Sequence, residues 1–204
     1  SRHCHKKTNR LTIMSIKKAK TSIRPSMMLT MIFYAFIFST AVRGAELELP
    51  YSLFQAINER LEYMEDVALF KAQNYIPIED VEREKIVLSD AKEVAAKHGL
   101  DPDSMERFFI AQINAAKAIQ YRYRAEALTR AMPTRSVDLQ SEIRPALTRL
   151  GSHIVTLFAA QLQNQTPIEE ESRERFMKTL QSRLLADTER EALFDAMLEV
   201  RIQH

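Results

Sequence analysis

Two cations lie on what would otherwise be the apolar face of the first predicted helix. Arg60 and Lys71 are eleven residues apart, so at about 100° per residue they point in nearly the same direction, about 16 Å apart along the axis. Apolar residues continue this face at helical steps of three and four: Leu53, Ile57, Met64 and Val67. Because an isolated buried cation is very costly, inward-facing cations indicate a bound anion or paired acids.

Polar residues also interrupt the apolar faces of the next two predicted helices. Asp80, Arg83 and Glu84 share one face of the second helix, and Gln120 continues the apolar face of the third. This pattern predicts a pocket for a small anion between the helices of a bundle. Spacing alone leaves a second interpretation open. In that interpretation the charged ends reach solvent from the edges of apolar stripes and form ion pairs such as Arg60 with Glu84.

Other kinds of catalytic site find little support in the sequence. His98 and His153 are far apart and have no neighbouring cysteine or acid cluster, so a zinc site is not expected. The three glycines, Gly44, Gly99 and Gly151, exclude a phosphate-binding loop and a dinucleotide fingerprint. The sequence therefore predicts neither a metal ion nor an organic cofactor.

Charge is divided unevenly along the chain. Lys and Arg number 29 and Asp and Glu 27, but nine of the cations and none of the acids lie in residues 1–45. Residues 46–204 therefore hold 20 cations and 27 acids, a formal charge of −7. A basic surface for binding nucleic acid is not expected on this part of the chain.

The first 45 residues have the composition of a secretory signal peptide. Basic residues follow Met14, residues 27–38 form a nearly unbroken apolar run, and small residues come next. Cleavage after Ala41 or after Gly44 would fit, and residues 1–13 precede a plausible start. The run is about 12 residues long, short of the roughly 20 that a membrane-spanning helix needs. An uncleaved membrane anchor is the alternative. Export would leave a periplasmic or secreted protein without cysteine and without lasting membrane association, since Cys4 is the only cysteine.

Helical periodicity runs through residues 46–204, where no run of alternating β-branched residues suggests a strand. Gly99 ends one helix, and Asp101 with Pro102 begins the next. Thr188 with Glu191 has the spacing of a capping box for the last helix. We expect one all-α domain, a compact six-helix bundle, with helices at about 50–73, 79–98, 102–131, 139–164, 168–186 and 189–203.

Six short strings together resemble one family, the all-α chorismate mutases of AroQ type, in their exported gamma subclass. The ordered set is specific: an arginine, a lysine eleven residues on, an Arg-Glu pair twelve further, then a helix with glutamine. The strings are AINERL (56–61), DVALFK (66–71), IEDVERE (78–84), GLDP (99–102), FFIAQI (108–113) and AKAIQ (116–120). The resemblance covers about 75 residues strongly, and residues 139–204 only loosely.

The resemblance implies an isomerase that converts chorismate to prephenate, on the pathway to phenylalanine and tyrosine. In this family the reaction is a pericyclic rearrangement that needs no covalent intermediate and no cofactor. The substrate is a dianion, and charge builds on its ether oxygen as the carbon–oxygen bond breaks. By position, Arg60 and Arg83 would bind carboxylate, while Lys71 and Gln120 would donate hydrogen bonds to the ether oxygen. A homodimer is also implied.

The resemblance also implies roles for three further residues. Glu84, with Asp80, would hold the ring hydroxyl, and Arg144 would supply a further cation from the fourth helix. Ala116 departs from the family pattern, because relatives often have a small hydroxyl residue there. Lys117 matches a family string but is given no direct role.

Two other functions remain as alternatives to the enzyme. One is an exported helical protein that binds an anionic small molecule without catalysis. The other is an interaction protein whose last two helices dock another chain. Loss of the inward polar residues would have favoured either, yet Arg60, Lys71, Arg83 and Gln120 are all present, which favours the enzyme.

Overall fold

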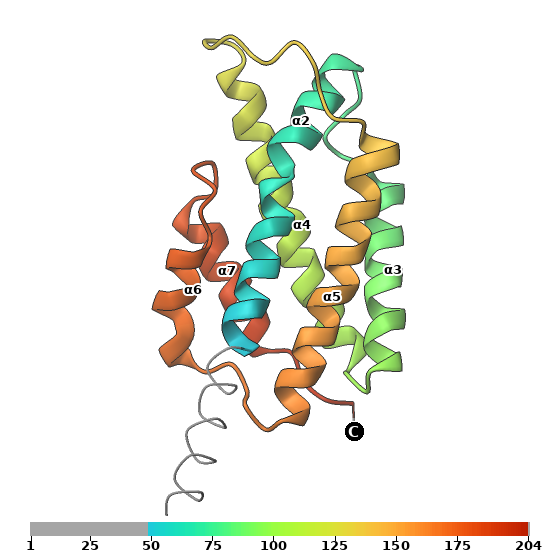
Figure 1. The fold of residues 1–204 in the computed structure, drawn as a ribbon, viewed down its shortest axis with the longest axis vertical. Coiled ribbons are helices and arrows are strands. Elements are labelled where there is room, and N and C mark those ends of the chain that lie inside the picture. The colour runs from blue at the N-terminus through green and yellow to red at the C-terminus, as the bar shows by residue number, and fades with distance from the viewer. Residues whose placement is uncertain (1–48, 204) are drawn as a thin grey trace, which may run out of the picture. The chain divides into compact units, whose positions relative to one another are not determined.

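The computed structural model describes residues 49–203, and all regular structure in this range is helical apart from one isolated bridge between Leu100 and Ile202 (Figure 1). The predicted all-α class is therefore confirmed. If 49–73 is counted as one helix with a turn at Tyr63, the described residues contain the six predicted α-helices. The segments are 49–62, α2 (Met64–Gln73), α3 (Val81–Lys97), α4 (Pro102–Glu126), the π-helix η1 (Leu139–Ile143), α5 (Arg144–Gln163), the 3₁₀-helix η2 (Glu170–Ser172), α6 (Arg173–Thr179) and α7 (Asp187–Leu198).

Local capping explains where the helices begin around the site. The Asp80 side chain accepts a hydrogen bond from the Arg83 N–H at 3.1 Å and caps α3. Asp101 accepts from the Asp103 N–H at 2.9 Å, with proline in the first turn of α4. Gly99 has φ +73°, a left-handed conformation that glycine adopts without strain, and it separates α3 from α4.

The predicted bounds of the last two helices are wrong. The helix expected at 168–186 is the short α6, and beyond it the carbonyls of Leu180, Ser182 and Leu184 accept hydrogen bonds from arginine side chains. Arg190 donates to the Ser182 carbonyl at 2.9 Å, and Arg122 donates to the Leu184 carbonyl at 2.8 Å. The last helix runs from Asp187 to Leu198 and not from 189 to 203, and Glu189, in place of Glu191, accepts the Ala186 N–H at 2.9 Å.

The end of α4 was also placed too late. The helix stops at Glu126 and not near 131. Leu128, just beyond, is 86% exposed, so the chain has no apolar contact there that would reward continuing the helix.

Helix α4 is central to the packing. It lies against α2, α3 and α7, while α5 packs on α3 (Figure 1). Aromatic rings join the C-terminal helices to the bundle: Phe176 meets Phe54 at 5.2 Å and Phe194 at 5.5 Å between ring centroids. Within residues 49–203, no helix has both the length and the apolar character to cross a bilayer. The predicted leader, its cleavage sites and Cys4 lie outside the described residues.

Candidate active site

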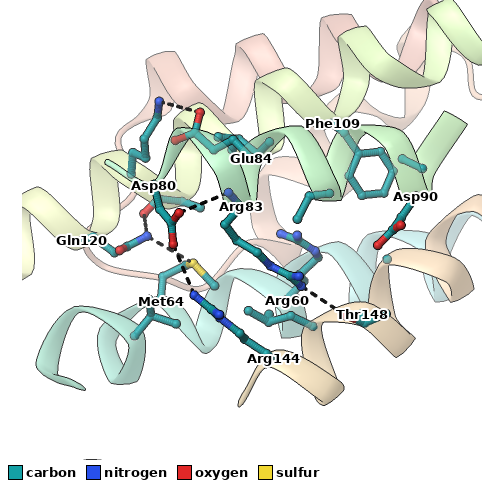
Figure 2. Close-up of a pocket in the computed structure, with 18 of the residues that line it drawn as sticks. Arg60, Met64, Asp80, Arg83, Glu84, Asp90, Phe109, Gln120, Arg144 and Thr148 are labelled. Carbon is teal, nitrogen blue, oxygen red and sulfur yellow. Dashed lines mark hydrogen bonds and ion pairs between the residues drawn. The ribbon is translucent and has the colours of Figure 1, made fainter. Parts of the chain in front are cut away.

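A partly open cavity of about 130 Å³ lies among residues of 49–62, α2, α3, α4 and α5 (Figure 2). Every residue that the sequence singled out as a site candidate lines it, together with apolar residues such as Val67, Val87 and Phe109. The candidates are Arg60, Lys71, Asp80, Arg83, Glu84, Gln120 and Arg144. Residues 84 positions apart in the chain therefore surround one space.

Arg60 is a buried cation that pairs with no acid of the described residues. Its side chain comes from the helix of residues 49–62, and the residue is 5% exposed. Within residues 49–203 it has no hydrogen bond, and its buried Nε is unpaired. Its guanidinium carbon lies 5.8 Å from the centre of the Phe109 ring. Burial, and then the charge of Arg83, lowers the pKa of Arg60 to about 10. Such a group favours a bound anion.

Lys71 and Gln120 are also buried, at 6% and 5% exposed. The Lys71 ammonium donates to the Ile78 carbonyl at 2.6 Å. Burial is the main cause that lowers the pKa of Lys71; Asp80 opposes it. The Gln120 amide donates to the Ala116 carbonyl at 3.2 Å, and its Oε1 is buried without a partner among the described residues. Lys71 therefore has donors left for a ligand. The Gln120 amide also donates weakly to the Met64 sulfur at 3.7 Å, so it can offer a ligand its free Oε1, or an N–H group in exchange for the sulfur contact.

Arg83 and Arg144 complete the cationic part of the cavity. Arg144 donates to Asp80 Oδ2 at 3.2 Å, so the carboxylate that caps α3 also holds the first residue of α5. Arg83 donates weakly to the Thr148 hydroxyl at 3.4 Å and pairs with no acid in the described range. Figure 2 shows the Arg60 and Arg83 side chains close together between Asp80 and Thr148.

The ion pair of Arg60 with Glu84, which the alternative interpretation expected, is absent from residues 49–203. Glu84 instead accepts from Lys117 at 3.3 Å, and Lys117 also donates to Glu79 at 3.1 Å. From the sequence, Lys117 received no direct role in the site, although it belongs to the string at 116–120. Lys117 lies three residues before Gln120 on α4, and both line the cavity. Thr148 was missed too, and its hydroxyl gave no signal in the sequence.

The lining charges match a doubly charged anion. Five cations line the cavity, namely Arg60, Lys71, Arg83, Lys117 and Arg144, against three carboxylates, Asp80, Glu84 and Asp90. Five minus three leaves a formal charge of +2, although residues 46–204 together carry −7. Residues 49–203 hold no group of three His, Cys, Asp or Glu side chains placed to bind a metal ion.

A helical bundle around a cavity with an excess of two positive charges in its lining is suited to a small anionic ligand held between the helices. The chain matches the family model for type II chorismate mutases over residues 51–121. It is 37% identical over 147 residues to the secreted chorismate mutase of Yersinia pestis, covering 72% of this chain and 79% of that protein. It is 35% identical over 156 residues to a monofunctional chorismate mutase of Enterobacter agglomerans, covering 75% and 84%.

A solved structure agrees with the sequence comparisons. The crystal structure of the Yersinia pestis secreted chorismate mutase aligns with a TM-score of 0.68 at 34% identity, over 74% of this chain and 97% of that one. The chain therefore belongs to the type II chorismate mutase family, which confirms the resemblance seen in the sequence. It is an enzyme, and the binding protein without catalysis is not supported.

Proposed function

We propose that this protein binds the chorismate dianion in the cavity and rearranges it to prephenate. The observation that carries this proposal is the excess of two positive charges in the lining, where Arg60 is buried and pairs with no acid of residues 49–203. Two carboxylates would neutralise that excess. No acid, base or nucleophile is needed, because the reaction is pericyclic, and the cavity acts by holding the reactive conformation and stabilising developing charge.

Arg60 and Arg83 are suited to the carboxylates, because a planar guanidinium can donate two parallel hydrogen bonds to one carboxylate. Lys71 and Gln120 would donate to the ether oxygen as its bond breaks. Charge on that oxygen grows only in the transition state, so these two donors lower the barrier and do not merely tighten substrate binding. Lys71 would exchange its bond to the Ile78 carbonyl for this contact.

Glu84, assisted by Asp80, would accept the hydrogen bond of the ring hydroxyl. Arg144 would contribute its remaining donors to a carboxylate while Asp80 holds it in place. Ala116 has no hydroxyl with which to bind a substrate carboxylate, so only backbone could serve at that position. The carboxylate clamp would then rest on arginine alone.

We also propose that the protein acts outside the cytoplasm, in the periplasm or after full secretion. Two relatives are named secreted chorismate mutases, from Yersinia pestis and Mycobacterium tuberculosis, and residues 1–45 have the order of a signal peptide. Residues 46–204 would form the mature single domain and assemble as a homodimer. N-terminal sequencing of the exported protein would give Val42 or Ala45 as the first residue, and light scattering would give the mass of a dimer.

The direct test incubates the purified exported protein with chorismate, without added metal or cofactor, and identifies the product by NMR. Formation of prephenate well above the spontaneous rate supports the proposal. Lys92 offers a matched control, because Lys92→Ala removes a lysine that pairs with Asp103 and Glu106 away from the cavity. A well-folded protein that leaves chorismate unchanged would overturn the proposal.

A further inference from the structure

Lys117 lies at the centre of a small ionic network on the cavity wall. Its ammonium donates to Glu79 Oε2 at 3.1 Å and to Glu84 Oε2 at 3.3 Å, and its side chain is 23% exposed. One turn further along α4, the Tyr121 hydroxyl donates to Glu79 Oε1 at 3.1 Å. Two residues of α4 thus hold Glu79, and through Lys117 they also hold Glu84 on the first turn of α3.

The way in which Glu84 is held leaves half of its carboxylate free. Lys117 contacts Oε2, while Oε1 makes no hydrogen bond to any residue of 49–203. Glu84 also lines the cavity. A free glutamate side chain has many rotamers, and freezing one of them on substrate binding costs conformational entropy. A partner already in place removes that cost, because the acceptor is oriented before the ligand arrives.

Lys117 and Glu79 both stay charged at neutral pH. Burial lowers the pKa of Lys117, but its hydrogen bonds to Glu79 and Glu84 outweigh burial, so the net pKa is raised. The hydrogen bonds from Lys117 and Tyr121 lower the pKa of Glu79. Lys117 is therefore a protonated donor throughout the neutral range.

We propose that Lys117, anchored by Glu79 and Tyr121, is a positioning residue that fixes Glu84 Oε2 so that Oε1 receives the ring hydroxyl of chorismate. This inference rests on the proposed function and on the hydroxyl-binding role of Glu84. Lys117 does not touch the reacting atoms, so its loss affects substrate binding more than turnover.

The experiment compares Lys117→Met with wild type in steady-state kinetics. We expect KM for chorismate to rise about tenfold, as for the weakening of one hydrogen bond to a charged group, while kcat stays within about threefold. Lys117→Arg, which keeps the donor and the charge, should restore most of the KM. Lys92→Met is the matched control: Lys92 also joins α3 to two carboxylates of α4, at 2.9 and 2.8 Å, but lies outside the cavity lining. Its KM should equal that of wild type.

Two further measurements separate positioning from a general charge effect. In a Glu84→Gln background, Lys117→Met should add little to KM, since its action passes through Glu84. With a chorismate analogue that lacks the ring hydroxyl, the two single variants and wild type should have similar KM. If Lys117→Met raises KM for the analogue as much as it raises KM for chorismate, Lys117 acts only as a charge and the inference is wrong. The same holds if Lys117→Met raises KM by its full factor in the Glu84→Gln background.

Failure of the inference can be told apart from failure of the function or of folding. A wild-type protein without mutase activity would refute the function itself, whereas an active wild type with an unchanged Lys117→Met would refute only the positioning role. If Lys117→Met does not fold, Glu79→Gln serves instead, because Glu79 is exposed, lies outside the cavity lining and contacts Lys117 and Tyr121. It should raise KM about threefold, as for a partial loss of one such hydrogen bond, and an unchanged KM would overturn the inference.

Discussion

Replacing Arg60 with methionine should make the protein more stable and inactive. Arg60 is 5% exposed and has no hydrogen-bond partner among residues 49–203. Burial, with a contribution from Arg83, lowers its pKa to about 10. At about 1.36 kcal/mol for each pKa unit, this disfavours the charged form in the folded protein by about 3 kcal/mol. Methionine has a similar length and fits among the apolar residues of the lining.

The sign of the effect follows from proton binding. Between the lowered pKa of folded Arg60 and the higher pKa of the unfolded chain, the unfolded state binds more protons, so stability rises with pH in that alkaline window. Near pH 7 both states are protonated, and the folded state carries the full penalty. We therefore expect Arg60→Met to raise the free energy of unfolding at pH 7 by about 1–3 kcal/mol, with Tm higher by about 2–4 °C per kcal/mol.

Urea unfolding at pH 7, followed by circular dichroism, measures the stability change. Thermal unfolding with prephenate, the product dianion, measures how much ligand binding depends on Arg60. At 100 times its Kd a ligand stabilises the fold by about 2.7 kcal/mol, so wild type should gain this amount and Arg60→Met much less at the same concentration. Turnover of chorismate should fall with the lost clamp.

Arg83→Met is the matched control for this experiment. Arg83 is partly exposed, and within residues 49–203 its side chain donates only to Thr148, so its replacement should weaken prephenate binding without raising stability. If Arg60→Met is no more stable than wild type, the folded protein compensates the Arg60 charge in another way, and the reasoning from burial is refuted.

Three further predictions concern single side chains of the site. Lys71→Ala should reduce kcat by about 10²–10³ while circular dichroism stays helical, because a donor to developing charge is lost; near-normal turnover would remove Lys71 from the ether oxygen. The wild-type rate should stay level from pH 8 to pH 5, since Gln120 does not titrate. Gln120→Glu should be slow at pH 7 and should recover only as acid protonates the new carboxyl group. A wild-type rate that climbs steadily below pH 5 would contradict this. Asp80→Ala should lower the free energy of unfolding in urea by about 1 kcal/mol through loss of the α3 cap, and an unchanged value would show that the cap is dispensable.

The start of α4 could be predicted from the sequence. Asp101 with Pro102 opens this helix, because a side-chain oxygen reaches backbone N–H groups only two or three residues away. The end of α6 could not be predicted in this way. The Leu184 carbonyl is bound by Arg122, 62 residues away in the chain, and such a long-range donor leaves no periodic trace.

The sequence by itself determined the all-helical class, the family and seven of the polar residues that meet in the cavity, whereas Lys117, Asp90 and Thr148 were added by the structure. Helical spacing decides which side chains share a face, so Arg60 and Lys71 had to lie on the same side of the first helical segment. Only the tertiary structure decided which charges pair. Glu84 is held by Lys117 and Asp80 by Arg144, while Arg60 has no acid. Ion pairing acts over a few ångströms in space, and packing between helices, not spacing within one, sets those distances.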